Sequence, residues 1–596
     1  MHRGYTFRIL VSLCTTGVRT MSPAWLILLL MLCGSSSTVS IPYEKFYQKQ
    51  SLGFSVDNRI SCIGCVLLVS LTEQLAQVHN SSIQDAMESL CSYLPENPNV
   101  SGLCTVLIEI YGPEIIKLLN HKWNGDVVCH AMKLCKNDPD QPVCHIYQQP
   151  KGGIRKAIMQ AEKTVKQSNF MKKSEIVSNI FLKLCSLPIL RNICDAMETS
   201  TPLEDFDHDN FSGFPTLRGY HWRGRDCNDF DMSIYPGKRP RDWDALKDSN
   251  CNGIWGFDPE DGIPHEKKFC EGTDTKGIIV LGDSAAAHFH IPPQWMTALK
   301  MSKETFADLP MALSNELDWP QFSLYTGFQN STNGIPTNSL YLHLRNLNRC
   351  NHRDYQSIAR NGGSYGNIHN YIESMARNQQ LDKPAIVFYA LIGNDVCNDY
   401  EDTLKHMTTP ENMKSSLLKT LQFMDSRLPN GSHIVLIQLA DGRFLWNSLH
   451  DRYHPIGQLN KDVTYEQFYS FLTCLQSNPC EGWMSANETL RNLTTERADQ
   501  LSGVLNEVAS SYKFNNFDMV YFDNLYQKVI AEWSKVGGEP WQLIEPVDGF
   551  HPNQLASAIG ADIIWKVATE KWPELFGKEN PHNKEIIAMF GDQGGH

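Results

Sequence analysis

The spacing of hydrophobic residues divides the chain into two kinds of region. Before about residue 150, apolar residues recur every three or four positions, which is the period of one helix face. Two such faces are Leu68, Leu71, Leu75 and Val78, and Leu103, Val106, Leu107 and Ile110. Pro113 can begin a further helix, because proline is tolerated in the first turn. This part of the chain is predicted to form several short amphipathic helices.

After residue 270, short apolar runs alternate with polar segments of helix length. Four runs are predicted strands: 277–283, 385–392, 434–439 and 517–522. Continuous hydrophobicity is typical of strands buried on both faces of a parallel sheet. We therefore predict a doubly wound α/β domain over 271–575, with reactive groups beyond the carboxyl ends of its strands. Residues 576–596 are expected to form a C-terminal tail.

The N-terminal segment 1–40 is predicted to be a signal peptide. An apolar run over 25–33 precedes small residues over 34–40. Met21 lies just ahead of the run, so residues 1–20 are a candidate N-terminal extension. Removal of the segment leaves 16 of the 18 cysteines, an even number that suits an oxidising compartment.

Seven Asn-x-Ser/Thr sites indicate a glycoprotein of the secretory pathway. They are Asn80, Asn99, Asn210, Asn330, Asn430, Asn487 and Asn492. The chain is expected to be secreted, lysosomal or held in granules. Its 596 residues exceed one compact core, and its net charge of −13 argues against a nucleic-acid partner.

The helical region, 43–148, contains six cysteines in a characteristic order. They are Cys62, Cys65, Cys91, Cys104, Cys129 and Cys135. Among amphipathic helices this spacing resembles the saposin B-type family of lipid-binding domains. The resemblance implies the pairs Cys62–Cys135, Cys65–Cys129 and Cys91–Cys104, and a fold that binds acyl chains. The alternative is a disulfide-rich helical domain with a purely structural role.

A basic stretch over 149–200 contains Lys172-Lys173. Exposed polar linkers are where proteolysis concentrates, so this stretch is a candidate linker or propeptide with a processing site. The alternative is an uncut helical linker. Cys144 falls outside the six-cysteine pattern and is expected to pair with a distant cysteine.

An Asp- and Asn-rich segment over 201–270 is predicted to bind structural Ca²⁺, which takes many oxygen ligands from tight loops. The candidate ligands are Asp205, Asp207, Asp209 and Phe211; Asp226, Asn228, Asp229 and Asp231; and Asp244, Asp248, Asn250, Asn252 and Ile254. Phe211 and Ile254 would act through their carbonyls. The third loop departs from the EF-hand pattern, because Pro259 occupies position twelve. Acidic loops that are merely solvated are the alternative.

Polar clusters follow two of the predicted strands. They are Gly282-Asp283-Ser284 and Gly393-Asn394-Asp395; Arg360-Asn-Gly362-Gly363 lies between them, and Asp548-Gly-Phe-His551 follows the last strand. A serine hydroxyl needs an imidazole to accept its proton, and the imidazole needs a carboxylate to orient it. Ser284, His551 and Asp548 are therefore the candidate nucleophile, base and orienting acid.

An ester attacked by serine develops an oxyanion, which requires preorganised donors. The candidates are the N–H of Ser284, the N–H of Gly363 and the side-chain amide of Asn394. Gly362 is the alternative to Gly363. His288 and His290 lie close to Ser284 in sequence, but they fall on the segment predicted to form the next helix and are interpreted as structural.

These four blocks, taken in order, resemble the Ser, Gly, Asn and His blocks of the GDSL or SGNH esterase family. The resemblance implies an SGNH hydrolase fold of flavodoxin-like type and an acyl-serine intermediate. Each block could instead have a purely structural role; a GDS turn, for example, can simply join a strand to a helix.

The order of a saposin-like module, an Asp-rich segment and an SGNH domain resembles secreted hydrolases that deacylate bacterial lipopolysaccharide. It implies cleavage of secondary acyl chains from lipid A at a membrane or micelle surface. It also implies a precursor cut into small and large chains joined by a disulfide, for which we expect Cys144–Cys474. Proximity in sequence indicates Cys185–Cys194 and Cys227–Cys251 as further pairs. The alternatives are a broader phospholipase or lysophospholipase, and a non-catalytic lipid-presenting protein.

Overall fold

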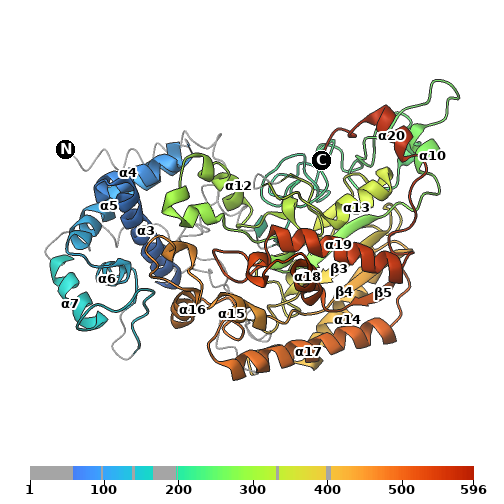
Figure 1. The fold of residues 1–596 in the computed structure, drawn as a ribbon. Helices are drawn as coiled ribbons and strands as arrows, with labels where there is room; N and C mark the ends of the chain where they lie inside the picture. The colour runs from blue at the N-terminus through green and yellow to red at the C-terminus, as the bar shows by residue number, and fades with distance from the viewer. Residues whose placement is uncertain are drawn as a thin grey trace, which may run out of the picture.

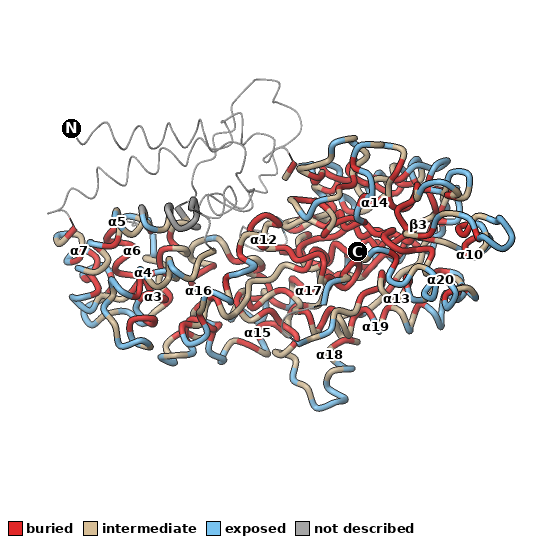
Figure 2. Tube along the Cα trace, turned by 90° about the horizontal axis from the view of Figure 1, so that it is seen from above, coloured by how far each residue is buried: buried red, intermediate tan, exposed pale blue. Residues whose placement is uncertain are grey.

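The computed structural model describes residues 58–95, 98–136, 141–165, 196–197, 199–330, 334–397 and 405–596. The predicted signal peptide, the Lys172-Lys173 site and the Cys185–Cys194 pair lie outside these residues. The described chain forms a helical region, 58–165, beside a larger sheet domain, 199–596 (Figure 1). Buried residues concentrate around the sheet, and a smaller buried set lies within the helical region (Figure 2).

Five helices form the helical region. They are α3 (Asn58–His79), α4 (Ile83–Tyr93), α5 (Pro98–Asn120), α6 (Gly125–Ala131) and α7 (Ile154–Val165). The disulfides Cys62–Cys135 and Cys65–Cys129 tie α3 to α6 and the segment after it, and Cys91–Cys104 ties α4 to α5; they are the pairs that the saposin resemblance implies. Leu75, Val127 and Val128 are fully buried between the helices. A core this small needs such crosslinks.

Helix α7 lies inside the stretch that the sequence indicated as a linker. Its apolar face, Ile154, Ala157, Ile158, Ala161 and Val165, is buried, and the helix packs against α6 and α5. The helical region therefore continues past residue 148 to at least Val165, because these apolar positions follow the helical period.

Helix α3 is long and apolar enough over Ser61–His79 to cross a membrane by length and composition. It is held by two disulfides and packs against α4 and α6, so it serves as the central helix of this region.

The sheet has five parallel strands in the order β2-β1-β3-β4-β5. They are β1 (Gly277–Gly282), β2 (Tyr355–Ser357), β3 (Ala385–Ala390), β4 (Ser432–Ile437) and β5 (Phe517–Phe522). Ile279 is in register with Val387, and Val387 with Ile434. This is the flavodoxin-like order, and the predicted doubly wound α/β fold is confirmed. The three-residue β2 was not predicted.

Helices cover both faces of this sheet, because alternate strand residues point to opposite faces. Ile278 and Val280 share one buried cluster with residues of α13 and α19, and Ile279 and Leu281 share the other with residues of α14 and α17. The helices of the sheet domain are α10 (His265–Cys270), α11 (Ser284–Ala287), α12 (Leu309–Ser314), α13 (Leu340–Leu347), α14 (Pro410–Arg427), α15 (Arg443–Leu449), α16 (Tyr465–Cys474), α17 (Glu488–Ser511), α18 (Leu525–Lys535), α19 (Gln554–Lys571) and α20 (Asn583–Phe590).

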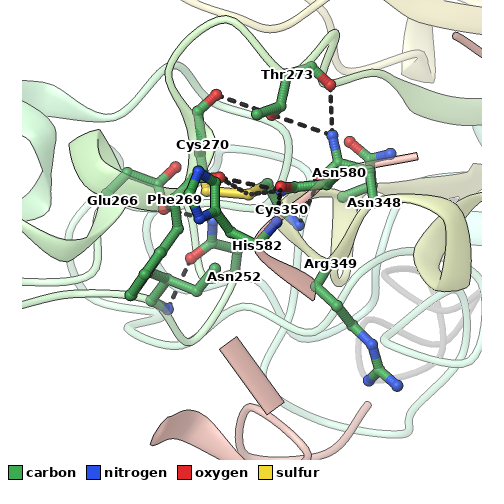
Figure 3. The surroundings of a disulfide bond; sticks show 12 residues. Asn252, Glu266, Phe269, Cys270, Thr273, Asn348, Arg349, Cys350, Asn580 and His582 are labelled. Carbon is green, nitrogen blue, oxygen red and sulfur yellow. Dashed lines mark hydrogen bonds between the residues drawn. A yellow bond between two sulfur atoms is a disulfide. The ribbon is translucent and has the colours of Figure 1, made fainter. Parts of the chain in front are cut away.

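The segment expected as a tail, 576–596, belongs to the fold. Ile586 of α20 is fully buried in a small cluster that contains Phe269 and the disulfide Cys270–Cys350. Asn580 Nδ2 donates to the carbonyl of Phe269 at 3.0 Å and to Asn348 Oδ1 at 2.9 Å beside that disulfide (Figure 3). Apolar positions at helical spacing therefore close this end of the domain.

The two regions are joined by the disulfide Cys144–Cys474, the pair expected from the sequence. Helix α3 lies against the short turns Ala298–Lys300 and Pro455–Gly457. Gln74 Nε2 donates to the carbonyl of Ile456 at 2.6 Å. The helical region is thus docked on the sheet domain by a covalent bond and by direct contacts.

Candidate active site

Ser284 lies where β1 ends and α11 begins. Asp283 caps the helix, with Oδ1 accepting from the N–H of Ala285 at 3.1 Å and Oδ2 accepting from the N–H of Ile392 at 2.7 Å. A Cβ at Gly282 would lie 2.3 Å from the Cβ of Ala286, so the turn before the serine requires glycine. The capping carboxylate therefore fixes the serine relative to the end of β3.

His551 and Asp548 come from the loop before α19. Nε2 of His551 lies 2.7 Å from Oγ of Ser284, and Nδ1 lies 2.5 Å from Oδ2 of Asp548. Oδ1 of Asp548 accepts from the N–H of Phe550 at 2.8 Å and of His551 at 3.1 Å, which fixes its direction. Ser284 and His551 are each 8% exposed. The structure thus brings the three predicted side chains together in the order a serine esterase needs.

The predicted oxyanion donors are arranged around this serine with one complication. Asn394 follows β3, and its Nδ2 donates to the carbonyl of Gly363 at 2.9 Å. The N–H of Gly363 donates to the carbonyl of Arg360 at 2.9 Å in a tight turn. In this conformation Gly363 contributes its carbonyl to the placement of Asn394, and its role as an oxyanion donor stays a prediction.

Asp395 holds the Gly363 loop against the end of β3. Its Oδ2 accepts from the N–H of Tyr365 at 3.0 Å, and its Oδ1 accepts from Thr408 Oγ1 at 2.7 Å. Burial raises the pKa of Asp395 and of Asp283 to about 6 each. Hydrogen bonds from backbone N–H groups favour the ionised forms and act to lower these pKa values, but burial outweighs them. Two buried carboxylates therefore position the loops around the serine.

A pocket opens beside the triad, and Ser284, His551 and Asn394 are among the residues that line it. Its apolar walls are formed by Ile392, Ala440, Phe444, Leu445, Trp483, Val529, Ile530, Leu543, Ile544, Phe550 and Ala556. A lining of this kind suits an apolar ligand with one polar end. The site can therefore hold a hydrocarbon chain with its ester at the serine.

The sequence predicted that His288 and His290 lie on the helix after Ser284, and this prediction is wrong. Helix α11 ends at Ala287, and His288 has φ +61° as its C-cap. His288 is buried, and burial lowers its pKa to about 3, so it is a neutral core residue. The sequence after Ala287 gave no signal that the helix ends there.

His290 has a partner that sequence reasoning missed. Its Nδ1 lies 2.7 Å from Oε2 of Glu545, whose side chain is 3% exposed. Burial acts to lower the pKa of His290, but the Glu545 carboxylate outweighs it and raises that pKa overall. The N–H of Glu545 donates to the carbonyl of His551 at 2.8 Å. The pair therefore links the nucleophile segment to the base segment.

Five of the predicted calcium ligands gather in two overlapping groups. Asp205, Asp207 and Asp229 form one, and Asp207, Asp209 and Asp226 form the other; within each, the ligand atoms lie within 4.8 Å of one another. Among the described residues, Oδ2 of Asp209 and of Asp226 is buried without a hydrogen-bond partner. Burial raises the pKa of Asp226 to about 7 and of Asp209 to about 8, helped by the neighbouring carboxylates. Clustered acids with orphaned oxygens fit a divalent cation.

The other predicted ligands are not members of these two groups of carboxylates. Asp231 instead pairs with Lys247 at 3.1 Å, and hydrogen bonds from Ser233 and Lys247 lower its pKa to about 2. The N–H groups of Asn228 and Phe211 donate to Asp226 and Asp209. The carbonyl of Asn228 accepts from the N–H groups of Phe230 and Asp231.

The third loop forms a separate hydrogen-bonded unit. Asp244 accepts from Ser249, Asp248 from the N–H groups of Asn252 and Gly253, and the N–H of Ile254 donates to Asn252. The amides of Asn250 and Asn252 donate to the buried Glu266 at 3.0 and 2.9 Å. The disulfide Cys227–Cys251, expected from the sequence, ties this loop to the second one.

The predicted glycosylation sites lie mostly at the surface. Asn80, Asn330, Asn430, Asn487 and Asn492 are exposed, and Asn210 is half-buried. The side chain of Asn99 lies outside the description.

Two family models match the chain. The saposin-like domain matches residues 61–195, which includes much of the stretch predicted as a linker, and the GDSL-like lipase/acylhydrolase matches residues 278–564. Acyloxyacyl hydrolase of Mus musculus is 55% identical over 572 residues, covering 95% of this chain and 98% of that one. Acyloxyacyl hydrolase of Homo sapiens is 57% identical over 546 residues, covering 91% and 94%. Saposin-C of Cavia porcellus is 30% identical over 78 residues, 13% of this chain and 94% of its own.

Proposed function

The chain belongs to the acyloxyacyl hydrolase family and is a lipid esterase, and we propose that it removes secondary fatty acyl chains from the lipid A of bacterial lipopolysaccharide. An acyloxyacyl ester joins a fatty acid to the hydroxyl group of another acyl chain. The observation that carries the proposal is the apolar pocket whose lining includes Ser284 and His551. Such a pocket holds the chain to be released and leaves its carbonyl at the nucleophile.

In the proposed mechanism Ser284 attacks the ester carbonyl while His551 Nε2, 2.7 Å away, accepts its proton. Asp548 orients the imidazole through Nδ1 and stabilises the imidazolium that forms. His551 then returns the proton to the departing hydroxyl oxygen. Water, deprotonated by the same imidazole, attacks the acyl-Ser284 ester and releases the fatty acid.

The oxyanion is proposed to rest against the N–H of Ser284 and the amide of Asn394. Both groups stand at strand ends, where they are fixed before the substrate arrives, and fixed donors lower the barrier because they need no reorganisation. Gly363 would add a third donor after its N–H leaves the carbonyl of Arg360.

The helical region is proposed to lower the cost of withdrawing a lipid from its aggregate. Moving a chain into water costs roughly 0.8 kcal/mol per CH₂ group. An attached domain that accepts acyl chains removes most of this cost, whereas a water-soluble ester would need no such domain. This favours lipopolysaccharide over short-chain esters as the substrate.

Ser284→Ala, assayed with radiolabelled lipopolysaccharide micelles, tests the mechanism. We expect release of free fatty acid to fall by at least about 10³-fold, because the acyl-enzyme cannot form. Ser510→Ala, at an exposed position of α17, is the matched control and should retain full activity. Release that survives Ser284→Ala would exclude this nucleophile.

The substrate is tested separately with labelled phospholipid and lysophospholipid. Loss of acyl chains from phospholipid alone would contradict the lipopolysaccharide proposal and favour a broader phospholipase with the same triad. Binding and transfer of lipopolysaccharide without hydrolysis would favour a lipid-presenting role.

We further propose that Ca²⁺ stabilises the loops over 205–231, as the orphaned oxygens of Asp209 and Asp226 support. The cation would fix loop geometry away from the triad and take no part in the reaction. Secretion or lysosomal delivery, glycosylation and cleavage near Lys172-Lys173 into two disulfide-linked chains are proposals that rest on the sequence.

A further inference from the structure

Arg218 connects the Asp-rich segment to the loop that carries Gly363. Its side chain is 1% exposed. Its Nη1 donates to the carbonyl of Ala359 at 2.8 Å, and its Nη2 donates to Oε2 of Glu316 at 2.7 Å. Ala359 begins the oxyanion loop, which we define as residues 359–363. One guanidinium therefore binds two segments that lie 141 and 98 residues away in the sequence.

The turn that contains Glu316 contacts both the oxyanion loop and the nucleophile segment. The carbonyl of Glu316 accepts from Asn361 Nδ2 at 3.1 Å. The carbonyl of the next residue, Leu317, accepts from the N–H of His290 at 3.0 Å. Because His290 follows the nucleophile, a displacement of this turn would move the oxyanion loop relative to Ser284.

Both partners of the ion pair have a left-handed backbone conformation. The angle φ is +58° at Arg218 and +61° at Glu316, and it is +63° at Leu317. Residues other than glycine rarely adopt this conformation, because the Cβ atom crowds the backbone. Strain of this kind persists where the surrounding structure imposes it, and it concentrates at functional sites. The strained backbone therefore supports a placement of the two side chains that serves the active site.

The geometry of this link favours arginine over lysine. The planar guanidinium carries its donors in a fixed fork, so it binds a carbonyl and a carboxylate at the same time, whereas lysine offers a single ammonium group. The guanidinium of Arg218 also lies 3.9 Å from the centroid of the Trp222 ring, which restricts its plane. Trp222 Nε1 in turn donates to Oδ1 of Asn315 at 2.9 Å, beside Glu316 in the sequence.

We propose that Arg218 is a positioning residue that fixes the base of the oxyanion loop relative to Ser284. Neither Arg218 nor Glu316 lines the described pocket, so the pair acts through the loop. The N–H of Gly363 bonds to the carbonyl of Arg360 and must turn before it can donate to an oxyanion. A loop whose first residue is held by Arg218 can make this turn at its glycines and keep its position. The proposal rests on the esterase function of Ser284.

Arg218→Met combined with Glu316→Gln tests the proposal, because the double change removes the ion pair without leaving an unpaired buried charge. We expect kcat for fatty acid release from lipopolysaccharide micelles to fall by about 10²-fold, since a misplaced catalytic group costs a factor of this size. KM should change little, because the pocket walls remain. Arg218→Lys, which can reach only one of the two acceptors, should lower kcat by about tenfold.

Arg377→Met combined with Asp354→Asn is the matched control. This ion pair has a distance of 2.7 Å, and its side chains are 0% and 3% exposed. It lies beside Gly277 at the start of β1, whereas Ser284 follows the end of that strand. Both double variants are expected to lower Tm, but only the Arg218 variant should lower kcat. If the Arg218 double variant does not fold, Arg218→Lys provides the comparison.

A long-chain trifluoromethyl ketone measures the oxyanion contacts directly. Oγ of Ser284 adds to its carbonyl carbon, the serine proton passes to His551, and the carbonyl oxygen becomes an oxyanion. We expect the Ki of this ketone to rise in the Arg218 double variant by about the factor by which kcat/KM falls, because both report stabilisation of the transition state. The corresponding alcohol fills the pocket without forming an oxyanion and should bind equally to both proteins.

An unchanged kcat in both Arg218 variants would overturn the proposal, as would a loss of kcat equal to that of the control pair. A ketone Ki that stayed constant while kcat fell would also overturn it, by assigning the loss to general destabilisation. Hydrolysis of phospholipid alone by the unmodified chain would contradict the lipid A proposal. The same variants assayed on phospholipid would then still decide the role of Arg218.

Discussion

Glu545 connects the segment that carries the nucleophile to the segment that carries the base, and catalysis requires a fixed distance between them. Its carboxylate binds His290, which follows the nucleophile, and its N–H binds the carbonyl of the base His551. Neither His290 nor Glu545 lines the described pocket, so the pair acts on the placement of catalytic groups. Small displacements of such groups cost large factors in rate.

Glu545→Gln is expected to lower kcat about tenfold while KM changes little, because the substrate contacts remain. Steady-state kinetics over a pH series checks this. The folded-state pKa of His290 is raised by Glu545, and burial raises the pKa of Glu545 as well. The ion pair therefore requires a pH at which Glu545 is ionised, and it is lost as pH rises through the folded pKa of His290. The ratio of the two kcat values should therefore shrink at high pH.

Glu585→Gln is the matched control, because it removes the carboxylate of an exposed His582–Glu585 pair at 3.1 Å. It should leave kcat unchanged. If Glu545→Gln lowered only the thermal stability and left kcat unchanged at every pH, the His290–Glu545 pair would have a structural role and no role in catalysis.

At this scale the sequence predicted the reacting residues and missed their supports. Ser284, His551 and Asp548 stand in short motifs, whereas Glu545 is 255 residues from His290 and belongs to no motif. The exposure of the rings was equally hidden, since Phe206 and Phe211 lie in the same Asp-rich loop, yet Phe206 is 56% exposed and Phe211 1%. Only the folded chain decides which of them meets the core.

Helix α6 holds the segment after Cys144 through one buried carboxylate. Asp126 accepts from the N–H of Ile146 at 3.0 Å and of Tyr147 at 2.9 Å. Burial raises its pKa from 3.8 to about 6, although both N–H groups favour the ionised form. The contribution of Asp126 to stability is therefore full below pH 3.8 and declines as pH rises through about 6.

Comparison of Asp126→Asn with the unmodified chain in thermal melts tests this sign. We expect the stability advantage of aspartate over asparagine to be larger near pH 4 than near pH 7.5, about one unit or more on either side of the folded pKa. An advantage that grew with pH would contradict the direction of the shift.

The loops over 205–231 should depend on Ca²⁺ for stability. A cation that binds only the folded state stabilises by about 2.7 kcal/mol at 100 times its Kd. We expect chelation to lower Tm, and Asp207→Asn to abolish the rise on adding Ca²⁺, because Asp207 belongs to both ligand groups. Asp451→Asn, an exposed change outside the loops, should respond normally. An unchanged melt after chelation would exclude a structural cation.

Elements with a strong local signal were predictable, and those defined by distant contacts were not. Four strands follow from continuous apolar runs, but β2 has three residues and takes its identity from its register with β1. The pairs Cys270–Cys350 and Cys397–Cys480, 80 and 83 residues apart, were also not predicted. Their partners become neighbours only after the sheet has formed.

The whole molecule is held together by a bridge that spans 330 residues. Cys144 lies before the proposed cleavage site and Cys474 after it. Chain cleavage would therefore leave the helical region covalently attached to the sheet domain.

Electrophoresis of protein secreted from cultured cells tests the proposed processing. We expect one band without reductant and two with it, whereas Cys474→Ser should give two bands under both conditions. Lys172→Ala with Lys173→Ala should remain one band throughout. A single band for the reduced unmodified protein would exclude cleavage.

All the residues that line the described pocket fall between Asp283 and Ala556, within the sheet domain. Preference for a given fatty acid length is therefore inherited with that domain, independently of the part that meets the aggregate. If residues 58–165 were replaced by the helices of another lipid-binding domain, the chain would act on different lipid aggregates. The chain lengths of the released fatty acids would stay the same.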